Sequence, residues 1–235
     1  MRLGSTVLLS NQLCVQSYNW NHFRPLGKLQ TVVDELEHFE CDEIAIIRPV
    51  RQHDTFQSYA NDVITLKALH SMTPISFGGG IRSQWHLELI YGLPIERLIF
   101  SSAFLAKNES LIESAIGRFG RQSIQCMIPV FMHDNEVFVF NCSTGKKQSL
   151  KRYDFNFISD YANEVILYDC AREGQRDCFD FRILENIDIE ASRLVISGGI
   201  GADSRKKADD CRVASILIDN KTLHREYSVA GYRYA

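Results

Sequence analysis

Short, nearly continuous apolar runs alternate along the chain with segments of helical period, and this alternation constrains the fold more than any other feature. Such runs are typical of strands buried on both faces of a parallel sheet. Eight occur, namely Thr6–Leu9, Glu43–Val50, Pro74–Phe77, Arg97–Ser101, Ser123–Val130, Glu164–Tyr168, Arg193–Ser197 and Val213–Ile218. Eight strand–helix units predict a (β/α)8 TIM barrel, and 235 residues suit one such domain, residues 1–235.

The intervening segments supply the helices, and two places depart from the regular repeat. The predicted helices are Leu29–Phe39, Tyr59–Ser71, Gln84–Tyr91, Glu109–Phe119, Phe155–Ala162, Phe181–Asn186 and Ser204–Asp210. In Val130–Cys142, Asp134 and Asn135 separate two β-prone stretches, which predicts a hairpin inserted after the fifth strand. The chain continues only briefly after Ile218, so we expect a shortened last unit.

Charge and composition exclude several classes of function. A formal net charge of −3 and a pI near 6.2 give no general attraction to nucleic acid or to anionic membranes, and we expect neither as a partner. The N-terminal residues lack the pattern of a secretory signal, and no apolar run is long enough to span a bilayer, so we expect a cytoplasmic protein. Seven cysteines without a CxxC pair and histidines without HExxH spacing predict no metal and no cofactor.

Two glycine-rich turns are the first candidates for ligand binding. Residues 77–83, FGGGIRS, end the third run and open a helix, and residues 197–201, SGGIG, repeat this arrangement four units later. Bare backbone N–H groups at such a turn suit a phosphate, although glycine there also simply permits positive φ. The predicted phosphate-binding residues, with two serines after the fourth run, are Gly79, Gly80, Ser101, Ser102, Ser197, Gly198 and Gly199.

The two turns, together with RFGRQS before the fifth run and REGQRDCFDF after the sixth, give the chain a family resemblance. It resembles the cyclase (synthase) subunit of imidazole glycerol phosphate synthase, a barrel of histidine biosynthesis, over nearly its whole length. The resemblance implies an enzyme subunit of the lyase or amidotransferase type. That subunit receives ammonia from a glutaminase subunit and binds a substrate with a phosphate at each end.

The upper rim departs from the family at the positions that carry its chemistry. The family uses an aspartate at the end of the first strand and another at the end of the fifth, where this chain has Leu8 and Pro129. Neither side chain can transfer a proton. The carboxylates after the sixth strand, Asp169, Glu173 and Asp177, are therefore the candidate catalytic residues. Arg48 also replaces an aspartate that is expected at the end of the second strand.

The opposite face keeps its charges. Arg2 precedes the first strand, and Glu43, Arg97 and Glu164 begin the second, fourth and sixth. By resemblance they form the gate through which ammonia enters the barrel from a glutaminase bound at the N-terminal face. A salt-bridged ring that only stabilises the barrel floor is the simpler interpretation, and both remain open.

Charged gate residues that match the family at one end of the barrel, together with replaced catalytic residues at the other end, favour one functional hypothesis. The chain is expected to form a heterodimer with a glutaminase and to deliver ammonia to a phosphorylated or nucleotide-sugar acceptor, as in the amidation of sugars for surface polysaccharides. One alternative is the cyclase of histidine biosynthesis itself. The other is a catalytically silent barrel that only binds or activates a glutaminase.

Overall fold

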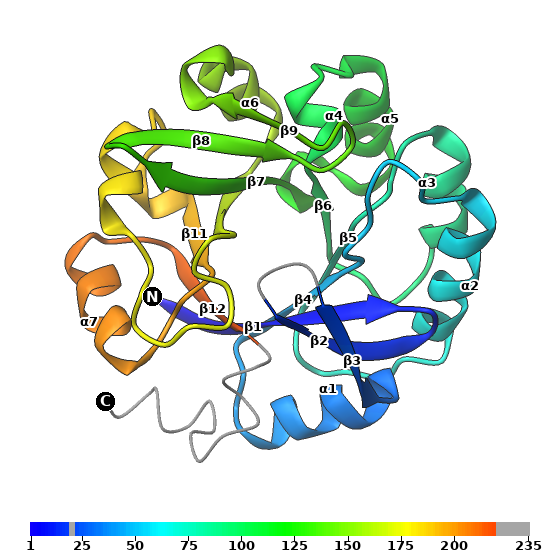
Figure 1. Ribbon diagram of the computed structural model, residues 1–235. Helices are drawn as coiled ribbons and strands as arrows, with labels where there is room; N and C mark the ends of the chain where they lie inside the picture. The colour runs from blue at the N-terminus through cyan, green and yellow to red at the C-terminus, as the bar shows by residue number, and fades with distance from the viewer. Residues whose placement is uncertain (19–21, 220–235) are drawn as a thin grey trace.

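Eight parallel strands close into a ring in the computed structural model, which describes residues 1–18 and 22–219. Hydrogen bonding between the fifth and sixth strands in chain order closes it, and Figure 1 looks along the barrel axis. In order around the ring the strands are β1 (Arg2–Ser10), β4 (Glu43–Ile47), β5 (Ile75–Gly78), β6 (Arg97–Phe100), β7 (Ile124–His133), β10 (Glu164–Asp169), β11 (Leu194–Ser197) and β12 (Ser215–Asp219). The predicted (β/α)8 barrel is confirmed.

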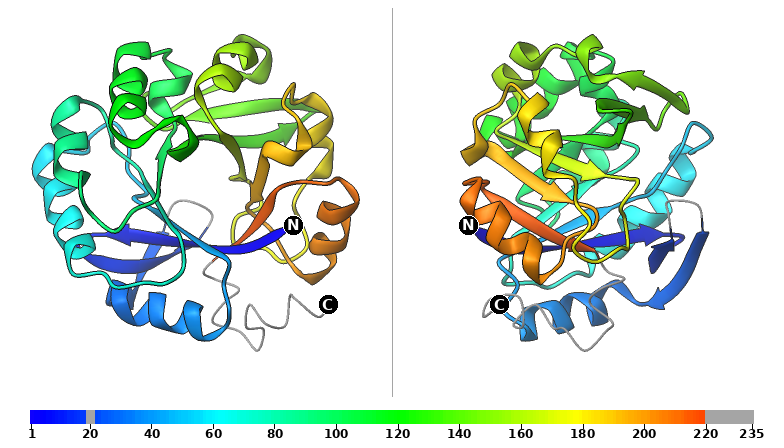
Figure 2. Two further views of the ribbon diagram at one scale, coloured as in Figure 1. Left: turned by 180° about the vertical axis from the view of Figure 1, so that it is seen from behind. Right: turned by 60° about the vertical axis from the view of Figure 1, so that its left-hand side comes forward.

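Helices surround the ring, as both views of Figure 2 show. The α-helices are α1 (Leu29–His38), α2 (Phe56–Lys67), α3 (Gln84–Ile90), α4 (Ser102–Leu105), α5 (Glu109–Phe119), α6 (Phe155–Tyr161) and α7 (Ala202–Asp210). Short 3-10 turns occur at η1 (Arg121–Ser123), η2 (Leu150–Arg152), η3 (Phe181–Asn186) and η4 (Ala191–Arg193). The α-helix predicted at Phe181–Asn186 is wrong in type, because this six-residue segment winds as the tighter 3-10 form.

Two antiparallel hairpins extend the barrel at the end where the strands finish. The predicted insertion is confirmed, since β7 continues through Asp134 and Asn135, with φ of 48° and 61°, into β8 (Glu136–Asn141). Strand β9 (Lys146–Ser149) adds to it. A second hairpin, β2 (Leu13–Tyr18) with β3 (His22–Gly27), follows β1 and has no counterpart in the prediction. The predicted shortening of the last unit lies outside the described residues.

The core has two parts, one outside the strands and one inside. Apolar side chains between the strands and the helices form the larger part. A second cluster fills the barrel interior with Leu8, Val15, Ala45, Ile47, Ile99, Met127, Ile166, Tyr168, Val195 and Leu217. Buried charged groups lie at both ends of the strands, among them Glu43 and Glu164 at strand starts and Asp169 and Asp219 at strand ends.

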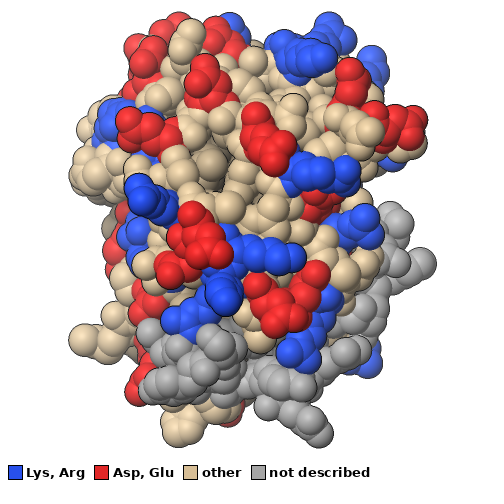
Figure 3. Space-filling view, turned by 90° about the vertical axis from the view of Figure 1, so that its left-hand side faces the viewer, with Lys and Arg blue, Asp and Glu red and all other residues tan. Residues whose placement is uncertain are grey.

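The surface carries interspersed charges, and the helices are short. Figure 3 shows acidic and basic side chains interleaved on the flank that includes α7. The longest α-helix among the described residues, α2, has 12 residues. Within the described part of the chain, none of the helices combines the length and the apolarity that crossing a membrane requires.

Candidate functional site

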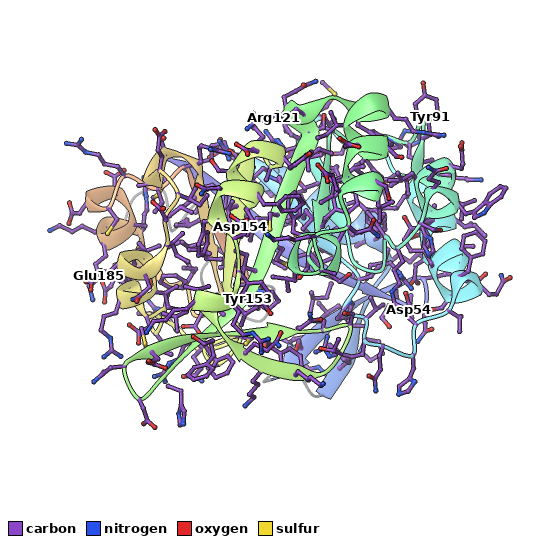
Figure 4. All side chains as sticks on the ribbon, turned by 90° about the horizontal axis from the view of Figure 1, so that it is seen from above. Asp54, Tyr91, Arg121, Tyr153, Asp154 and Glu185 are labelled. Atoms are coloured by element: carbon purple, nitrogen blue, oxygen red, sulfur yellow. The ribbon has the colours of Figure 1, made fainter. Side chains whose placement is uncertain are left out.

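A pocket opens at the end of the barrel where the parallel strands finish. Its apolar floor is formed by Leu8, Ile47, Ile99, Met127 and Tyr168. The space between its walls, including the open solvent at its mouth, is about 800 Å³. Asp54 and Tyr153 lie at this end in Figure 4, and Tyr91 and Arg121 lie at the opposite end. The pocket therefore occupies the carboxyl-terminal rim, where barrel enzymes carry their active sites.

One wall of the pocket contains the first predicted phosphate-binding set. Gly79 and Gly80 have φ of +97° and +84°, and a Cβ on Gly79 would lie 2.2 Å from the carbonyl oxygen of Arg48. The turn is therefore restricted to glycine, which leaves its backbone exposed to the pocket. Ser101 and Ser102 line the same pocket, and the buried Oγ of Ser101 has no hydrogen-bond partner among the described residues. The structure thus brings these four residues together.

Two arginines on this wall add positive charge, and the sequence prediction did not include them in the site. Arg51 and Arg82 both line the pocket. The guanidinium of Arg82 donates to the carbonyl oxygens of Arg51, at 2.6 Å, and of Asp54, at 3.3 Å. Arg82 belongs to the FGGGIRS motif, so its position directly after the glycines was the available signal.

Arg48 is the buried centre of this wall. Its side chain is 0% exposed, and its guanidinium contacts Asp54 at 2.9 Å and Asp62 at 2.8 Å. It also donates to the carbonyl oxygen of Gly79 at 3.1 Å. Burial opposes the charge, but the hydrogen bonds and charges of the two aspartates outweigh it and raise the pKa of Arg48. The arginine that replaces the expected aspartate therefore holds the glycine turn in place.

The second predicted phosphate-binding set lies elsewhere on the rim. Ser197, which is fully buried, donates from Oγ to the carbonyl oxygen of Leu217 at 3.1 Å. Gly198 and Gly199 again have positive φ, of 86° and 80°. The N–H of Gly199 donates to Oδ2 of Asp219 at 3.0 Å. These three residues are not among those that line the rim pocket, and their turn is bonded to a carboxylate of the protein itself.

The three predicted catalytic carboxylates also lie away from the pocket lining. Asp169 accepts hydrogen bonds from the backbone N–H groups of Ala171 and Asp180, at 3.2 and 3.3 Å. Asp177 accepts from the backbone N–H of Ser204, at 3.0 Å, in the first turn of α7. Glu173 is only 1% exposed. Asp169 and Asp177 thus hold loop backbone in place. This role could not be predicted from their position after a strand, because the donors at Asp180 and Ser204 lie further along the chain.

The two positions that carry aspartate in the resembled family are apolar in the structure as well. Leu8 lies in the pocket floor. Pro129 is buried and pairs in register with Tyr168 of the neighbouring strand β10. The residues that line the pocket offer arginines and hydroxyl groups as polar side chains, together with bare backbone and one thiol. This arrangement is suited to binding an anion.

The burial of Asp169 gives stability a defined dependence on pH. Desolvation raises the pKa of Asp169 to about 6 from an ordinary value of 3.8, although hydrogen bonds from Asp180 and Ala171 oppose the rise. The folded protein therefore binds this proton more tightly than the unfolded chain. Relative to Asp169→Asn, the wild type is expected to lose up to about 3 kcal/mol as pH rises from about 4 to above 6. Urea unfolding at several pH values measures this difference.

Asp180 supplies a control of opposite sign. Its pKa is lowered, first by hydrogen bonding from Arg182, so its stabilising effect is present above the ordinary pKa and is lost as pH falls. Asp180→Asn should therefore remove stability at neutral pH and not at acid pH. A wild type and an Asp169→Asn variant with parallel stability curves from pH 4 to 8 would contradict the expected effect of Asp169.

The predicted charged ring is assembled at the floor of the barrel. Arg2 contacts Glu43 at 3.2 Å and Glu164 at 2.6 Å, and Arg97 contacts the second oxygen of Glu43 at 3.1 Å. Gln125 donates to the second oxygen of Glu164 at 2.9 Å. Above the ring lies a narrow crevice too small to hold a water molecule, lined by Glu43, Ala45, Ser76, Gln125, Ile166, Val195 and Leu217. Four charges from four strands thus close the N-terminal end of the interior.

A parallel eight-stranded barrel with an anion-suited pocket at its rim and a charged ring at its floor defines the class of this protein. The chain belongs to the histidine biosynthesis protein family, whose model matches residues 14–223. Within the described residues, no group of three or more His, Cys, Asp or Glu side chains is arranged to hold a metal ion.

Relatives of known name are similar over most of the chain at low identity. A Vibrio vulnificus protein provisionally named imidazole glycerol phosphate synthase subunit hisF2 is 24% identical over 86% of this chain and 74% of its own length. The imidazole glycerol phosphate synthase subunit HisF of an Exiguobacterium species is 24% identical over 90% of this chain and 86% of its own. The HisF subunit of Staphylococcus aureus is 27% identical, with 85% and 84% covered.

Proposed function

We propose that this chain is the synthase subunit of a glutamine amidotransferase pair of the imidazole glycerol phosphate synthase type. It takes up ammonia at the floor of the barrel and delivers it to a phosphorylated acceptor in the rim pocket. The observation that carries the proposal is that a charged ring and an anion-suited pocket close opposite ends of one barrel interior. The names of the relatives support the same type of reaction.

The interior between the two ends suits ammonia rather than ammonium. Above the ring its walls include the small side chains of Ala45 and Ser76, and the layers beyond are apolar. Moving an ion through such a lining costs several kcal/mol, whereas neutral ammonia pays no comparable penalty. The ring of Arg2, Glu43, Arg97 and Glu164 then serves as the gate, because a rearrangement of these ion pairs opens the interior to the floor.

The outer surface around the ring suits a glutaminase partner. Met72 is 96% exposed in the loop before β5, and Tyr91 is 61% exposed at the end of α3, before β6. Met1, beside Arg2 of the ring, is 45% exposed. Large apolar side chains that rim a charged centre are characteristic of protein interfaces. In Figure 4 Tyr91 lies at the end of the barrel opposite Asp54, which keeps the partner away from the acceptor pocket.

The acceptor phosphate is assigned to the pocket wall made by Gly79, Gly80, Ser101 and Ser102. The positive φ of both glycines and the unpartnered Oγ of Ser101 support this assignment. Arg51 and Arg82, which line the same pocket, supply positive charge. Backbone and hydroxyl donors beside arginine match the acceptor oxygens of a phosphate.

The acceptor has two candidates, which different observations favour. The names of the relatives favour the histidine-pathway reaction, in which a ribulosyl aminoimidazole nucleotide is cyclised, over the amidation of a polysaccharide sugar. Leu8 and Pro129 favour a different phosphorylated acceptor, because an apolar side chain cannot act as a general acid or base. A phosphorylated sugar is the second candidate for this reason.

The test combines the purified chain with a glutaminase of the imidazole glycerol phosphate synthase type from the same genome. We expect formation of a heterodimer and at least a tenfold rise in glutamine hydrolysis when a phosphorylated acceptor is present. Glu43→Gln in the ring should reduce the share of ammonia that reaches the acceptor. Glu136→Gln, in strand β8 of the hairpin inserted after β7, is the matched control and should leave that share unchanged. A chain that neither binds the glutaminase nor stimulates it would overturn the proposal.

A second arm of the same experiment separates the acceptors. The ribulosyl aminoimidazole nucleotide is supplied with ammonium salt in place of the glutaminase, alongside a cyclase of established activity. Turnover comparable with that enzyme assigns the chain to the histidine pathway. Turnover lower by a factor of about a thousand is the loss expected when general acid–base groups are missing, and it favours the phosphorylated sugar.

A further inference from the structure

We propose that Asp219 is a built-in anion that fills the second glycine turn, so that the acceptor carries one phosphate group rather than two. Of the two acceptor candidates, this favours the phosphorylated sugar over the nucleotide with a phosphate at each end. The identity of the bound molecule as an acceptor rests on the proposed function, whereas the occupation of the turn by Asp219 does not. Asp219 is the last residue of β12 and is 1% exposed. Its carboxylate lies against the turn after β11, where it accepts the backbone N–H of Gly199.

The contacts of Asp219 are those that a bound anion would make. Oδ2 accepts the backbone N–H of Gly199 at 3.0 Å and that of Gly174 at 3.1 Å. Oδ1 accepts the hydroxyl of Tyr168 at 3.3 Å. Two backbone donors from different loops and one hydroxyl converge on this carboxylate. A carboxylate that accepts several such hydrogen bonds replaces an external anion in charge and in geometry.

A second carboxylate takes the donors at the neighbouring helix start. Asp177 accepts both the backbone N–H and the Oγ of Ser204, at 3.0 and 3.2 Å, in the first turn of the nine-residue helix α7. A Cβ on Gly201 would lie 2.2 Å from Oδ1 of Asp177, so that carboxylate is packed directly against the turn. The helix terminus that would otherwise attract a phosphate is therefore already capped by negative charge.

A phosphate entering this turn would have to displace Asp219 or share its donors. Sharing brings two anions within about 4 Å in a buried setting, which costs several kcal/mol. The first turn differs in this respect. Asp54 also lies against Gly80, 2.5 Å from where a Cβ on that glycine would be, but this carboxylate is paired with Arg48. The pocket lining at this turn adds Arg51, Arg82 and the hydroxyl of Ser101, which has no hydrogen-bond partner among the described residues. The two glycine motifs, alike in sequence, thus have opposite electrostatic roles.

Asp219 could instead serve only as a structural tie between β12 and the loop after β10. A tie and a built-in anion differ in the effect of removing the side chain. Loss of a tie lowers stability and opens no binding site. Loss of a built-in anion leaves the N–H groups of Gly199 and Gly174 available to phosphate.

The experiment measures binding of ribose 5-phosphate and ribulose 1,5-bisphosphate to the full-length protein by calorimetry. The wild type is expected to bind the two with affinities within about threefold of each other. In Asp219→Ser, which removes the charge and most of the side chain, the preference for the bisphosphate should rise at least tenfold. Asp219→Asn is the matched control, because its near-isosteric amide fills the turn and should raise the preference much less.

Three outcomes would overturn the proposal. They are a wild type that prefers the bisphosphate by tenfold or more, a folded Asp219→Ser with an unchanged preference, and an Asp219→Asn that gains as much as Asp219→Ser. If Asp219→Ser fails to fold, the wild-type preference alone decides. If the wild type binds neither sugar phosphate, the proposed acceptor site fails separately. Inorganic phosphate then decides this inference, which stands if Asp219→Ser binds phosphate and falls if it does not.

Discussion

Replacing Arg48 with methionine is expected to lower the free energy of unfolding by about 3–5 kcal/mol, the range for removing one partner of a buried ion pair. The guanidinium is fully buried between Asp54 and Asp62, whose side chains are 5% and 3% exposed. Methionine fills most of the space but leaves both carboxylates without their cation. Urea unfolding of the full-length protein, monitored by circular dichroism, measures the loss.

The controls separate charge from packing. Arg48→Met combined with Asp54→Asn and Asp62→Asn should recover a large part of the stability, because no uncompensated buried charge remains. Arg118→Met, which removes an exposed ion pair with Glu88, should leave the urea midpoint essentially unchanged. A loss in Arg48→Met as small as that of Arg118→Met would contradict the central role of Arg48.

The barrel strands were predictable because strands buried on both faces appear in the sequence as short, nearly continuous apolar runs. The predicted start of β4 at Glu43 and of β10 at Glu164 coincides with the observed start. The antiparallel extension that begins with β2 was not predicted, since the turn from β1 into β2 at Asn11 and Gln12 uses positive φ without a glycine. A turn of this kind gives no compositional signal.

The candidate site was predictable only where neighbours in sequence determine it. Gly79 and Gly80 form their turn locally, and their conformation follows from the lack of a Cβ. By contrast, the partner of Gly199 is Asp219, on the next strand of the barrel. Two similar glycine motifs therefore receive different surroundings from distant residues. The carboxylate of Asp169 likewise accepts hydrogen bonds from backbone N–H groups. Its position at a strand end did not determine whether it would face the pocket or the loop backbone.

A barrel can keep the charged ring at its floor while the residues at its rim are replaced, because the two ends depend on different side chains. The floor ring depends on charge pairs that reach from strand to strand, and Arg97 of β6 contacts Glu43 of β4 past the intervening β5. The rim depends on which side chains face the pocket, and single replacements such as Leu8 change its chemistry without changing the fold. The charge pairs of the floor and the chemistry of the rim pocket can therefore change independently in one barrel.

Gly79→Ala is expected to lower the free energy of unfolding by about 2–4 kcal/mol, from about 1 kcal/mol of left-handed backbone strain and about 1–3 kcal/mol of overlap. The overlap arises because its Cβ would lie 2.2 Å from the carbonyl oxygen and 2.8 Å from the Cβ of Arg48. The backbone of Arg48 is itself held by a 2.9 Å hydrogen bond to the carbonyl oxygen of Gly78. Urea unfolding measures the loss, and calorimetry with inorganic phosphate measures the accompanying loss of affinity.

Gly92→Ala is the matched control for Gly79→Ala. Gly92 also has positive φ, of +77°, but a Cβ there would meet no atom within 4 Å. It should therefore lose only the backbone term of about 1 kcal/mol and keep its phosphate affinity. The difference between the two variants then isolates the contact of the glycine turn with Arg48. Equal losses would mean that the strand end carrying Arg48 shifts to make room, in which case the pocket wall that contains Gly79 and Gly80 is not rigidly built around that residue.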